Sequence, residues 1–208
     1  MYQIAADACN AVITKNENSL LANYDKVFRD LALKQYNSET MLEYGWYGAN
    51  APDVRTGYTN GIPTNGTSKT FGKGGPQMIA MPTLYFDFDA GDQRRDVSVC
   101  NFGILANDNL QMSTYLGACV GKYRIDWKSE IGTSDSKRDI NFPLLRYSDV
   151  LLMYAEALNE LNNGPTAAAI KAFEDVRLRA FKNDATKIGT TPTTYDGFKN
   201  AIIEERKL

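Results

Sequence analysis

Residues 142–181, FPLLRYSDVLLMYAEALNELNNGPTAAAIKAFEDVRLRAF, carry the strongest pattern in the 208-residue chain. Apolar side chains recur with the period of a helix from Tyr147 to Leu161 and also occur on the other side, so we expect a helix that is buried nearly all round. Asn163-Gly164-Pro165 ends this pattern, with glycine as the stop and proline as the first residue of a second helix. In that second helix Ala169 and Phe173 show the small-to-large spacing of tetratricopeptide units. The stretch therefore predicts one helical hairpin at residues 147–181.

Three further helices are predicted outside this hairpin. Residues 3–13 and 20–34 both show apolar residues at helical spacing, and we expect them to form a helix pair in which Asn18 or Ser19 caps the second member. Residues 195–208 form another apolar stripe of the same period. Neither end of the sequence carries a helix start or stop signal, so we expect a part of a longer chain.

The middle of the chain differs in composition. Residues 48–82 are rich in Gly, Pro, Asn and Thr and show no hydrophobic period, which is typical of long loops that are either functional or disordered. Short strands are predicted at 39–47, 83–88 and 121–127. The sequence thus predicts a mainly α fold of tetratricopeptide-like hairpins with long irregular loops and a few short strands.

Composition excludes several classes of function. With 25 acidic and 23 basic residues the net charge is −2, and no basic stripe offers a footprint for nucleic acid. The chain has no histidine, which excludes Ser-His-Asp and Cys-His catalysis and histidine-ligated zinc. No apolar run approaches the roughly 20 residues that span a bilayer. Cys9, Cys100 and Cys119 form no CxxC pair; we expect buried thiols, and a disulfide between two of them stays open.

The acidic residues do not form an evident catalytic or metal site. The stretch Asp87–Asp92 fails the EF-hand template, because Gly91 and Ser98 stand at the ligand positions five and twelve of the loop, and position twelve requires Glu. We expect instead a structural turn of Asp92 with Arg94 and Arg95. Glu204 and Glu205 are adjacent, so their carboxylates diverge on a helix and cannot flank one glycosidic bond. No metal or other cofactor is predicted.

Two acidic residues lie within the apolar hairpin. Asp149 and Glu156 share one face of its first helix, where a buried charge needs a partner. We expect structural ion pairs with Arg146, Arg177 or Arg179 rather than catalysis.

Aromatic residues cluster at the start of the glycine-rich segment, between Tyr44 and Asn60. A flat aromatic ring stacks on the apolar face of a sugar, while neighbouring polar groups reach the hydroxyls. Packing in the core is the alternative for each ring taken singly. The candidate ligand-binding residues are Trp46, Tyr47, Asn50, Asp53, Arg55 and Tyr58, with Trp127 as a weaker candidate.

Several motifs together resemble the SusD/RagB family of surface nutrient-binding lipoproteins of Bacteroidetes. FPLLRYSDVLLMYAEALNE at 142–160 looks like the hallmark segment of that family, and AFEDVRLRA and FKNAIIEERKL follow it in the family's order. The matching upstream elements are NYDKVFRD, NSETMLEY, AGDQRRD and Gly121-Lys122-Tyr123. The family's N-terminal half and lipobox cysteine are absent, and Asp175 stands where Asn is usual.

The resemblance implies a SusD-like fold in which residues 1–208 are one region, truncated at both ends. Residues 48–140 would form the loop-rich ligand surface, and 142–208 the hairpin and following helix. It also implies a non-catalytic binder of oligo- or polysaccharide on the extracellular face of the outer membrane, anchored through lipid outside this sequence. A TonB-dependent transporter of the SusC type would be its partner. Two alternatives stay open: peptide binding, by a family member or a helical-repeat adaptor, and a carboxylate-based glycoside hydrolase.

Overall fold

The computed structural model describes residues 1–45, 56–128 and 140–208, and within it the chain divides into two units. The first unit consists of Met1–Tyr24, Ser38–Leu42 and Leu144–Leu208; the second consists of Asp25–Asn37 and Glu43–Pro143.

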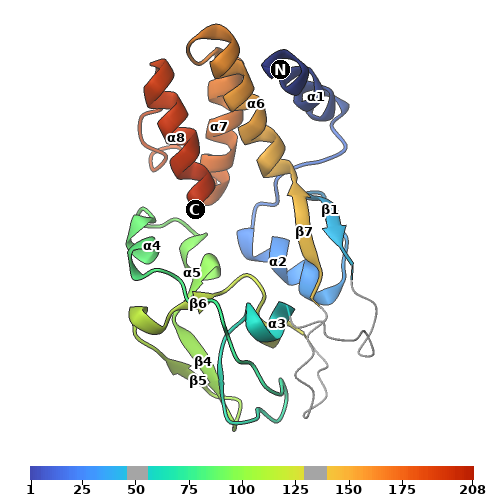
Figure 1. Cartoon of the computed structure of the whole chain (residues 1–208), viewed down its shortest axis with the longest axis vertical. Helices are drawn as coiled ribbons and strands as arrows, with labels where there is room; N and C mark the ends of the chain where they lie inside the picture. Colours follow the sequence, from blue (N-terminus) through green and yellow to red (C-terminus); the bar gives the residue numbers. More distant parts are fainter. Residues whose placement is uncertain (46–55, 129–139) are drawn as a thin grey trace. The chain divides into compact units, whose positions relative to one another are not determined.

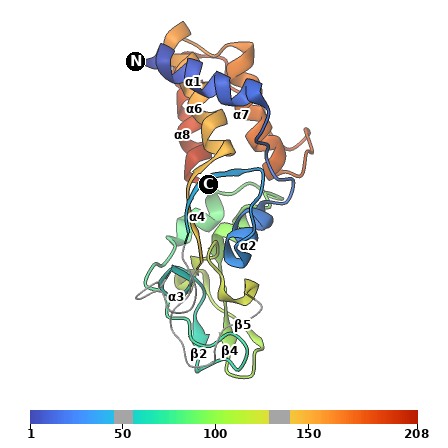
Figure 2. The ribbon, with the colours of Figure 1, turned by 90° about the vertical axis from the view of Figure 1, so that its right-hand side faces the viewer.

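The first unit is a small helical bundle. Its helices are α1 (Tyr2–Lys15), α6 (Tyr147–Asn162), α7 (Ala167–Ala180) and α8 (Tyr195–Lys207). Helix α6 is central, because it packs against α1, α7 and α8 (Figures 1 and 2). This central place explains why α6 carries apolar residues on nearly every side.

The predicted hairpin is confirmed, although its turn differs in detail. Asn163, and not glycine, ends α6 in the left-handed conformation with φ of 52°. Pro165 lies outside α7, whose N-cap is Thr166; the Thr166 hydroxyl accepts a hydrogen bond from the Ala169 amide at 3.2 Å. Asparagine tolerates the left-handed conformation and threonine caps a helix well, so two polar residues take the roles that were predicted for Gly164 and Pro165.

Side chains from three helices form the apolar core of the first unit. Leu151 of α6, Phe173 of α7 and Phe198 of α8 are each at most 4% exposed, and the two phenylalanine rings meet edge to face with centres 5.4 Å apart. The stripes predicted for the hairpin and for residues 195–208 therefore face one another.

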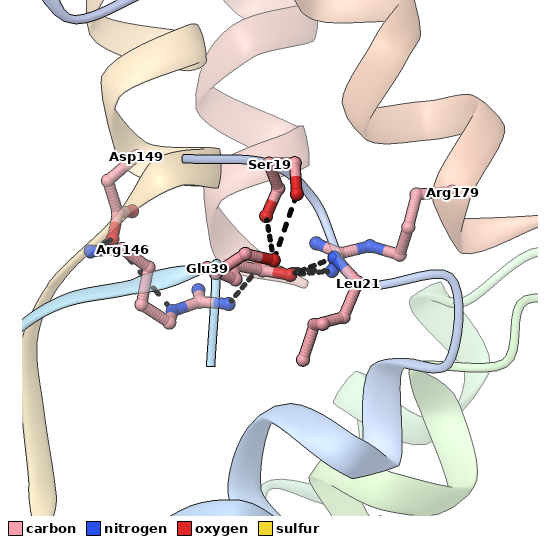
Figure 3. A network of polar contacts seen from close by, with 7 residues as sticks. Ser19, Leu21, Glu39, Arg146, Asp149 and Arg179 are labelled. Atoms are coloured by element: carbon pink, nitrogen blue, oxygen red, sulfur yellow. Dashed lines mark hydrogen bonds and ion pairs between the residues drawn. The ribbon is translucent and has the colours of Figure 1, made fainter. Parts of the chain in front are cut away.

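A buried carboxylate joins distant segments of the first unit (Figure 3). Glu39 is fully buried, and both of its oxygens accept hydrogen bonds from Arg179, at 3.0 and 2.8 Å. Arg146 donates to the same carboxylate at 3.4 Å, and the Leu21 amide donates at 2.9 Å. Two guanidinium groups and a backbone amide thus compensate the desolvation of this charge.

The predicted partners of the acidic residues in α6 are right for one residue and wrong for the other. Asp149 forms an ion pair with the Arg146 side chain at 3.9 Å, and it also accepts a hydrogen bond from the Arg146 amide at 3.3 Å and so caps its own helix. Glu156 is partly exposed and pairs with Arg206 at 3.3 Å rather than with Arg177. Arg177 instead pairs at 3.1 Å with Glu205, which is buried.

The prediction for residues 20–34 needs correction. Helix α2 spans Tyr24–Leu33, so it begins several residues later than expected. Asn18 and Ser19 do not cap it; both hydrogen-bond to Ser38. Helix α1 belongs to the first unit and α2, from Asp25 on, to the second, so the helices of the expected pair are divided between the two units.

The strand expected at 39–47 is confirmed as β1 (Thr40–Tyr44), which pairs with β7 (Phe142–Arg146). The other two predicted strands are wrong. Residues 83–88 lie mostly in helix α4 (Pro82–Asp87), which a proline begins. Residues 121–127 form a turn and the 3-10 helix η2 (Ile125–Trp127); burial of alternate side chains there imitates the pattern of a strand.

The second unit combines short helices with two small sheets. In one sheet the order is β2-β4-β5, with β2 parallel and β5 antiparallel to β4; in the other, β3 pairs antiparallel with β6. The strands are β2 (Thr64–Asn65), β3 (Val99–Cys100), β4 (Phe102–Leu105), β5 (Leu110–Met112) and β6 (Cys119–Val120), and the remaining helices are α3 (Thr56–Thr59), α5 (Arg95–Ser98) and η1 (Tyr115–Gly117). Residues 56–128 therefore carry more regular structure than the loops expected there.

This unit has its own core, in which Ile62, Ile104 and Ile125 are at most 1% exposed. Asp92 and Arg94 are also buried and form a two-pronged ion pair at 2.7 to 3.1 Å, which confirms the predicted turn for Arg94. The side chain of Arg95 pairs with Asp96 at 2.9 Å. None of the described helices is both long and apolar enough to cross a lipid bilayer.

Candidate functional site

A groove of about 710 Å³ lies over the β2-β4-β5 sheet of the second unit. Ile104 points into the core, so its neighbour Gly103 faces the opposite side of the sheet. Gln111 is the register partner of Gly103, and Asn65 is paired two residues further along β4, so both side chains belong to this same face. Leu105 of β4 shares this face beside Asn65, but Gly103 has no side chain, so the sheet is hollow at Gly103.

The floor of the groove cannot accept a larger residue without a shift of the backbone. A Cβ atom on Gly103 would lie 2.8 Å from the carbonyl oxygen of Pro63, closer than real Cβ contacts. The same close approach allows the Ile104 amide to donate to that carbonyl at 2.9 Å. Glycine at 103 is thus needed for strand pairing, and the groove follows from it.

The walls combine uncharged polar side chains with apolar ones. The nine lining residues include the amides Asn65 and Gln111, and no charged side chain is among them; the full set is Pro63, Thr64, Asn65, Gly103, Ile104, Gln111, Met112, Ser113 and Thr114. Within the part of the chain that the structure describes, neither amide side chain is hydrogen-bonded to another residue. Each amide offers both donors and an acceptor. Such a lining suits a neutral ligand that carries many hydroxyl groups.

A carboxylate holds the turn between β4 and β5 in place. Asp108, with φ of 69°, accepts hydrogen bonds from the hydroxyls of Ser68 and Thr70 at 2.5 and 2.6 Å. These hydrogen bonds lower the pKa of Asp108 below its ordinary value, because they favour the ionised carboxylate. The residues after β2 and the turn of the β4-β5 hairpin are therefore tied together at one end of the grooved sheet.

Most of the sequence-predicted binding residues cannot be placed. Trp46, Tyr47, Asn50, Asp53 and Arg55 lie outside the described residues. Tyr44, which precedes them at the end of β1, is 59% exposed.

Tyr58 lies in α3 and is partly buried against a neighbouring loop. Its carbonyl accepts from the Gly75 amide at 3.1 Å, and a Cβ on Gly75 would lie 2.9 Å from the Tyr58 hydroxyl oxygen. Its assignment to ligand binding stays a prediction.

Trp127 is not an exposed platform. It is 9% exposed, and the guanidinium groups of Arg29 and Arg124 lie 5.6 and 4.9 Å from its ring centre. Both contacts are of the cation–π type and stabilise a buried ring. A sugar would have to displace these partners, so the structure favours a role for Trp127 in packing.

The groove residues were not among those predicted from the sequence. Apolar and small residues in FGIL, the turn Asn107-Asp108-Asn109 and the segment LQM together form a hairpin signal that could have revealed them. In the described ranges, no group of three or more metal-ligating side chains comes together.

Comparisons with known proteins agree with this architecture. The family model described as the SusD family matches residues 43–208. SusD-like protein P25 of Formosa agariphila is 29% identical over 240 residues, which cover 99% of this chain and 43% of that protein. SusD-like protein P38 of the same organism is 27% identical and covers 100% of this chain and 45% of that protein. The chain thus spans less than half the length of these curated relatives.

A solved structure shares the fold. The SusD homolog of Bacteroides thetaiotaomicron superposes with a TM-score of 0.86 at 23% identity, over 99% of this chain and 45% of that one. An identity this low establishes the fold alone, whereas the family match covers the larger part of the chain, with the grooved sheet and the helical hairpin inside it. The chain therefore belongs to the SusD family.

Proposed function

We propose that this chain binds an oligo- or polysaccharide without cleaving it. The observation that carries the proposal is the uncharged groove, in which two amides and the hydroxyls of Ser113 and Thr114 stand around a hollow floor. Sugar hydroxyls both donate and accept hydrogen bonds, and amides and hydroxyls match them in both roles. Met112, which is 69% exposed, supplies an apolar surface for the C–H face of a sugar ring.

Binding without hydrolysis fits the acidic residues that the structure describes. Glycoside hydrolysis uses two carboxyl groups, about 5 to 9.5 Å apart, across the scissile bond. The described lining of the groove contains no carboxylate. Glu205, which is adjacent to Glu204 in the sequence, is buried against Arg177 instead.

The surroundings of the chain are proposed from its family. In the whole protein, a lipid anchor outside this sequence would hold the chain on the extracellular face of the outer membrane. A TonB-dependent transporter of the SusC type would take over the bound glycan. The aromatic segment Tyr44–Asn60 would add stacking to the hydrogen bonds of the groove.

Affinity electrophoresis tests the proposal directly. The 208-residue chain is run through gels that contain laminarin, starch, mannan or pectin, with bovine serum albumin as a reference for mobility. Laminarin is included because surface glycan-binding protein A of Bacteroides thetaiotaomicron, which shares the fold at 19% identity and a TM-score of 0.69 over 99% of this chain and 46% of that one, was solved in complex with laminarihexaose. Retardation in at least one glycan gel is expected, and isothermal titration calorimetry then gives the affinity.

Two parallel assays address the alternatives. Release of reducing sugar during incubation with the retarding glycan would indicate a hydrolase and contradict the proposal. Binding to a mixture of casein peptides, with no retardation in any glycan gel, would favour the peptide-binding alternative.

A further inference from the structure

Two cysteines of the second unit lie directly opposite each other. Cys100 of β3 and Cys119 of β6 are register partners, and each is 1% exposed. The Cys119 thiol donates a hydrogen bond to the Cys100 carbonyl at 3.5 Å. The third cysteine, Cys9, lies in α1 of the first unit.

The strand register gives this pair the spacing of a disulfide. The Gly121 amide donates to the Ser98 carbonyl at 3.1 Å, so residues 98 and 121 form a hydrogen-bonded pair of the antiparallel ladder. Hydrogen-bonded and non-hydrogen-bonded pairs alternate, which makes Cys100 and Cys119 a hydrogen-bonded pair with Cα atoms about 5.5 Å apart. Disulfides span Cα separations of about 4.4 to 6.8 Å. The two thiols can therefore be joined without a change in strand pairing.

We infer that Cys100 and Cys119 form an intrachain disulfide when the chain folds in the presence of a disulfide oxidant such as oxidised glutathione. One cysteine thiolate attacks a sulfur of the oxidant and releases one thiolate, which takes up a proton. The other cysteine, on losing its proton, attacks the mixed disulfide and releases the second thiol. Two electrons and two protons thus pass from the cysteine pair to the oxidant, which leaves as two thiols.

Both thiols are buried in the folded chain, each at 1% exposure. Burial would hinder exchange in the folded chain, so the bond forms during folding or local opening.

Closure of this bond would restrain the groove. The loop from Cys100 to Cys119 contains β4, β5 and most of the groove lining, namely Gly103, Ile104, Gln111, Met112, Ser113 and Thr114. A disulfide across a loop of this size lowers the conformational entropy of the unfolded chain. The restraint would therefore act on the segment that presents the polar groups of the groove.

The test uses the wild-type chain, refolded either with a glutathione redox buffer or with excess dithiothreitol. Each sample is denatured under acid quench, labelled with an alkylating reagent and digested for mass spectrometry. Only Cys9 should be labelled after oxidative refolding, with a linked peptide that joins Cys100 to Cys119; all three cysteines should be labelled in the reduced sample. The oxidised chain should melt about 6 °C or more above the reduced chain.

Two variants serve as controls. Cys9→Ala should keep the linked peptide and the difference in melting temperature, while Cys119→Ala should lose both. Labelling of all three wild-type cysteines after oxidative refolding, or a linkage through Cys9, would overturn the inference. Mapping of the wild-type chain alone decides this, even if Cys119→Ala does not fold.

Discussion

Arg179 donates two hydrogen bonds to the carboxylate of Glu39, which lies 140 residues earlier in the chain. Both side chains are at most 4% exposed, so water does not compensate either charge. Glu39→Gln should lower the free energy of unfolding by about 3 to 5 kcal/mol, because it leaves buried guanidinium charge without its partner. Urea denaturation measures this change.

Lys171→Gln is the matched control for that pair. It breaks an ion pair with Asp175 in which the lysine side chain is 73% exposed, and it should change stability by less than about 1 kcal/mol. Equal changes in the free energy of unfolding would show that the buried ion pair contributes no more to stability than the exposed one.

Leu151→Asp tests the core of the hairpin. Leu151 is 4% exposed and packs in the cluster of α6, α7 and α8, so a carboxylate there should cost several kcal/mol of stability. Leu161→Asp, on the same helix at 40% exposure, should cost much less. Thermal melts of both variants measure the difference, and similar melting temperatures would contradict the assignment of the buried face.

Asp108→Asn tests the hydrogen bonds that Asp108 accepts at the β4-β5 turn, through the pH dependence of stability. The pKa of Asp108 is lower in the folded chain than the ordinary 3.8, because the Ser68 and Thr70 hydroxyls donate to the ionised carboxylate. The contribution of these bonds to stability is complete above the ordinary pKa and is lost as pH falls through the lower folded value. Asparagine keeps the left-handed backbone but removes the charge.

Melting temperatures from pH 7 to pH 2.5 are the measurement. The wild-type chain should exceed Asp108→Asn at neutral pH, and the gap should narrow below about pH 4. A gap that is constant over the whole range would exclude the carboxylate as its cause.

The double variant Asn65→Ala/Gln111→Ala tests the groove. If the two amides bind sugar hydroxyls as proposed, their removal should weaken glycan binding about tenfold or more, since each hydrogen bond contributes roughly 1 kcal/mol. Both side chains are exposed, so stability should change little. Gln3→Ala/Asn162→Ala removes two exposed amides of the helical unit and should leave binding unchanged. Calorimetric affinity equal to wild type in the groove variant would place the glycan elsewhere.

The two tryptophans should respond differently to replacement by alanine. Trp46→Ala should weaken glycan binding about tenfold or more with little loss of stability, as expected for a stacking platform. Trp127→Ala should lower the free energy of unfolding by about 3 to 5 kcal/mol, because its ring is buried against two arginines. Calorimetry and thermal melts on both variants separate the roles; preserved affinity with reduced stability in Trp46→Ala would assign that ring to the core.

The helical part of the fold could be predicted because its signals are local. Apolar residues at the period of a helix gave α1, α6, α7 and α8 close to their bounds. Partners of buried charges could not be predicted in the same way, because the Glu39 and Arg179 pairing depends on how distant segments meet. Nothing in the sequence near Arg177 distinguishes Glu205 from Glu156 as its partner.

The groove was missed for a different physical reason. Its strands are two to four residues long, too short for a period of two to be recognised, and its hollow depends on one glycine opposite Gln111. The cluster of aromatic residues led instead to the prediction that Trp46 and Tyr47 bind the ligand, and the binding experiments test that prediction. The strand predicted at 121–127 is wrong because residues 123, 125 and 127 are apolar and buried in an irregular turn, which gives the same alternating pattern as a strand.

The glycine at 103 also bears on how ligand preference can change. A side chain at position 103 would collide with the Pro63 carbonyl, so a single substitution there cannot make the groove shallower without a shift of the backbone. Asn65 and Gln111 sit on exposed strand positions that accept most residue types. Ligand preference can therefore change through substitutions at the rim, in evolution or by design, while Gly103 at the floor stays constant.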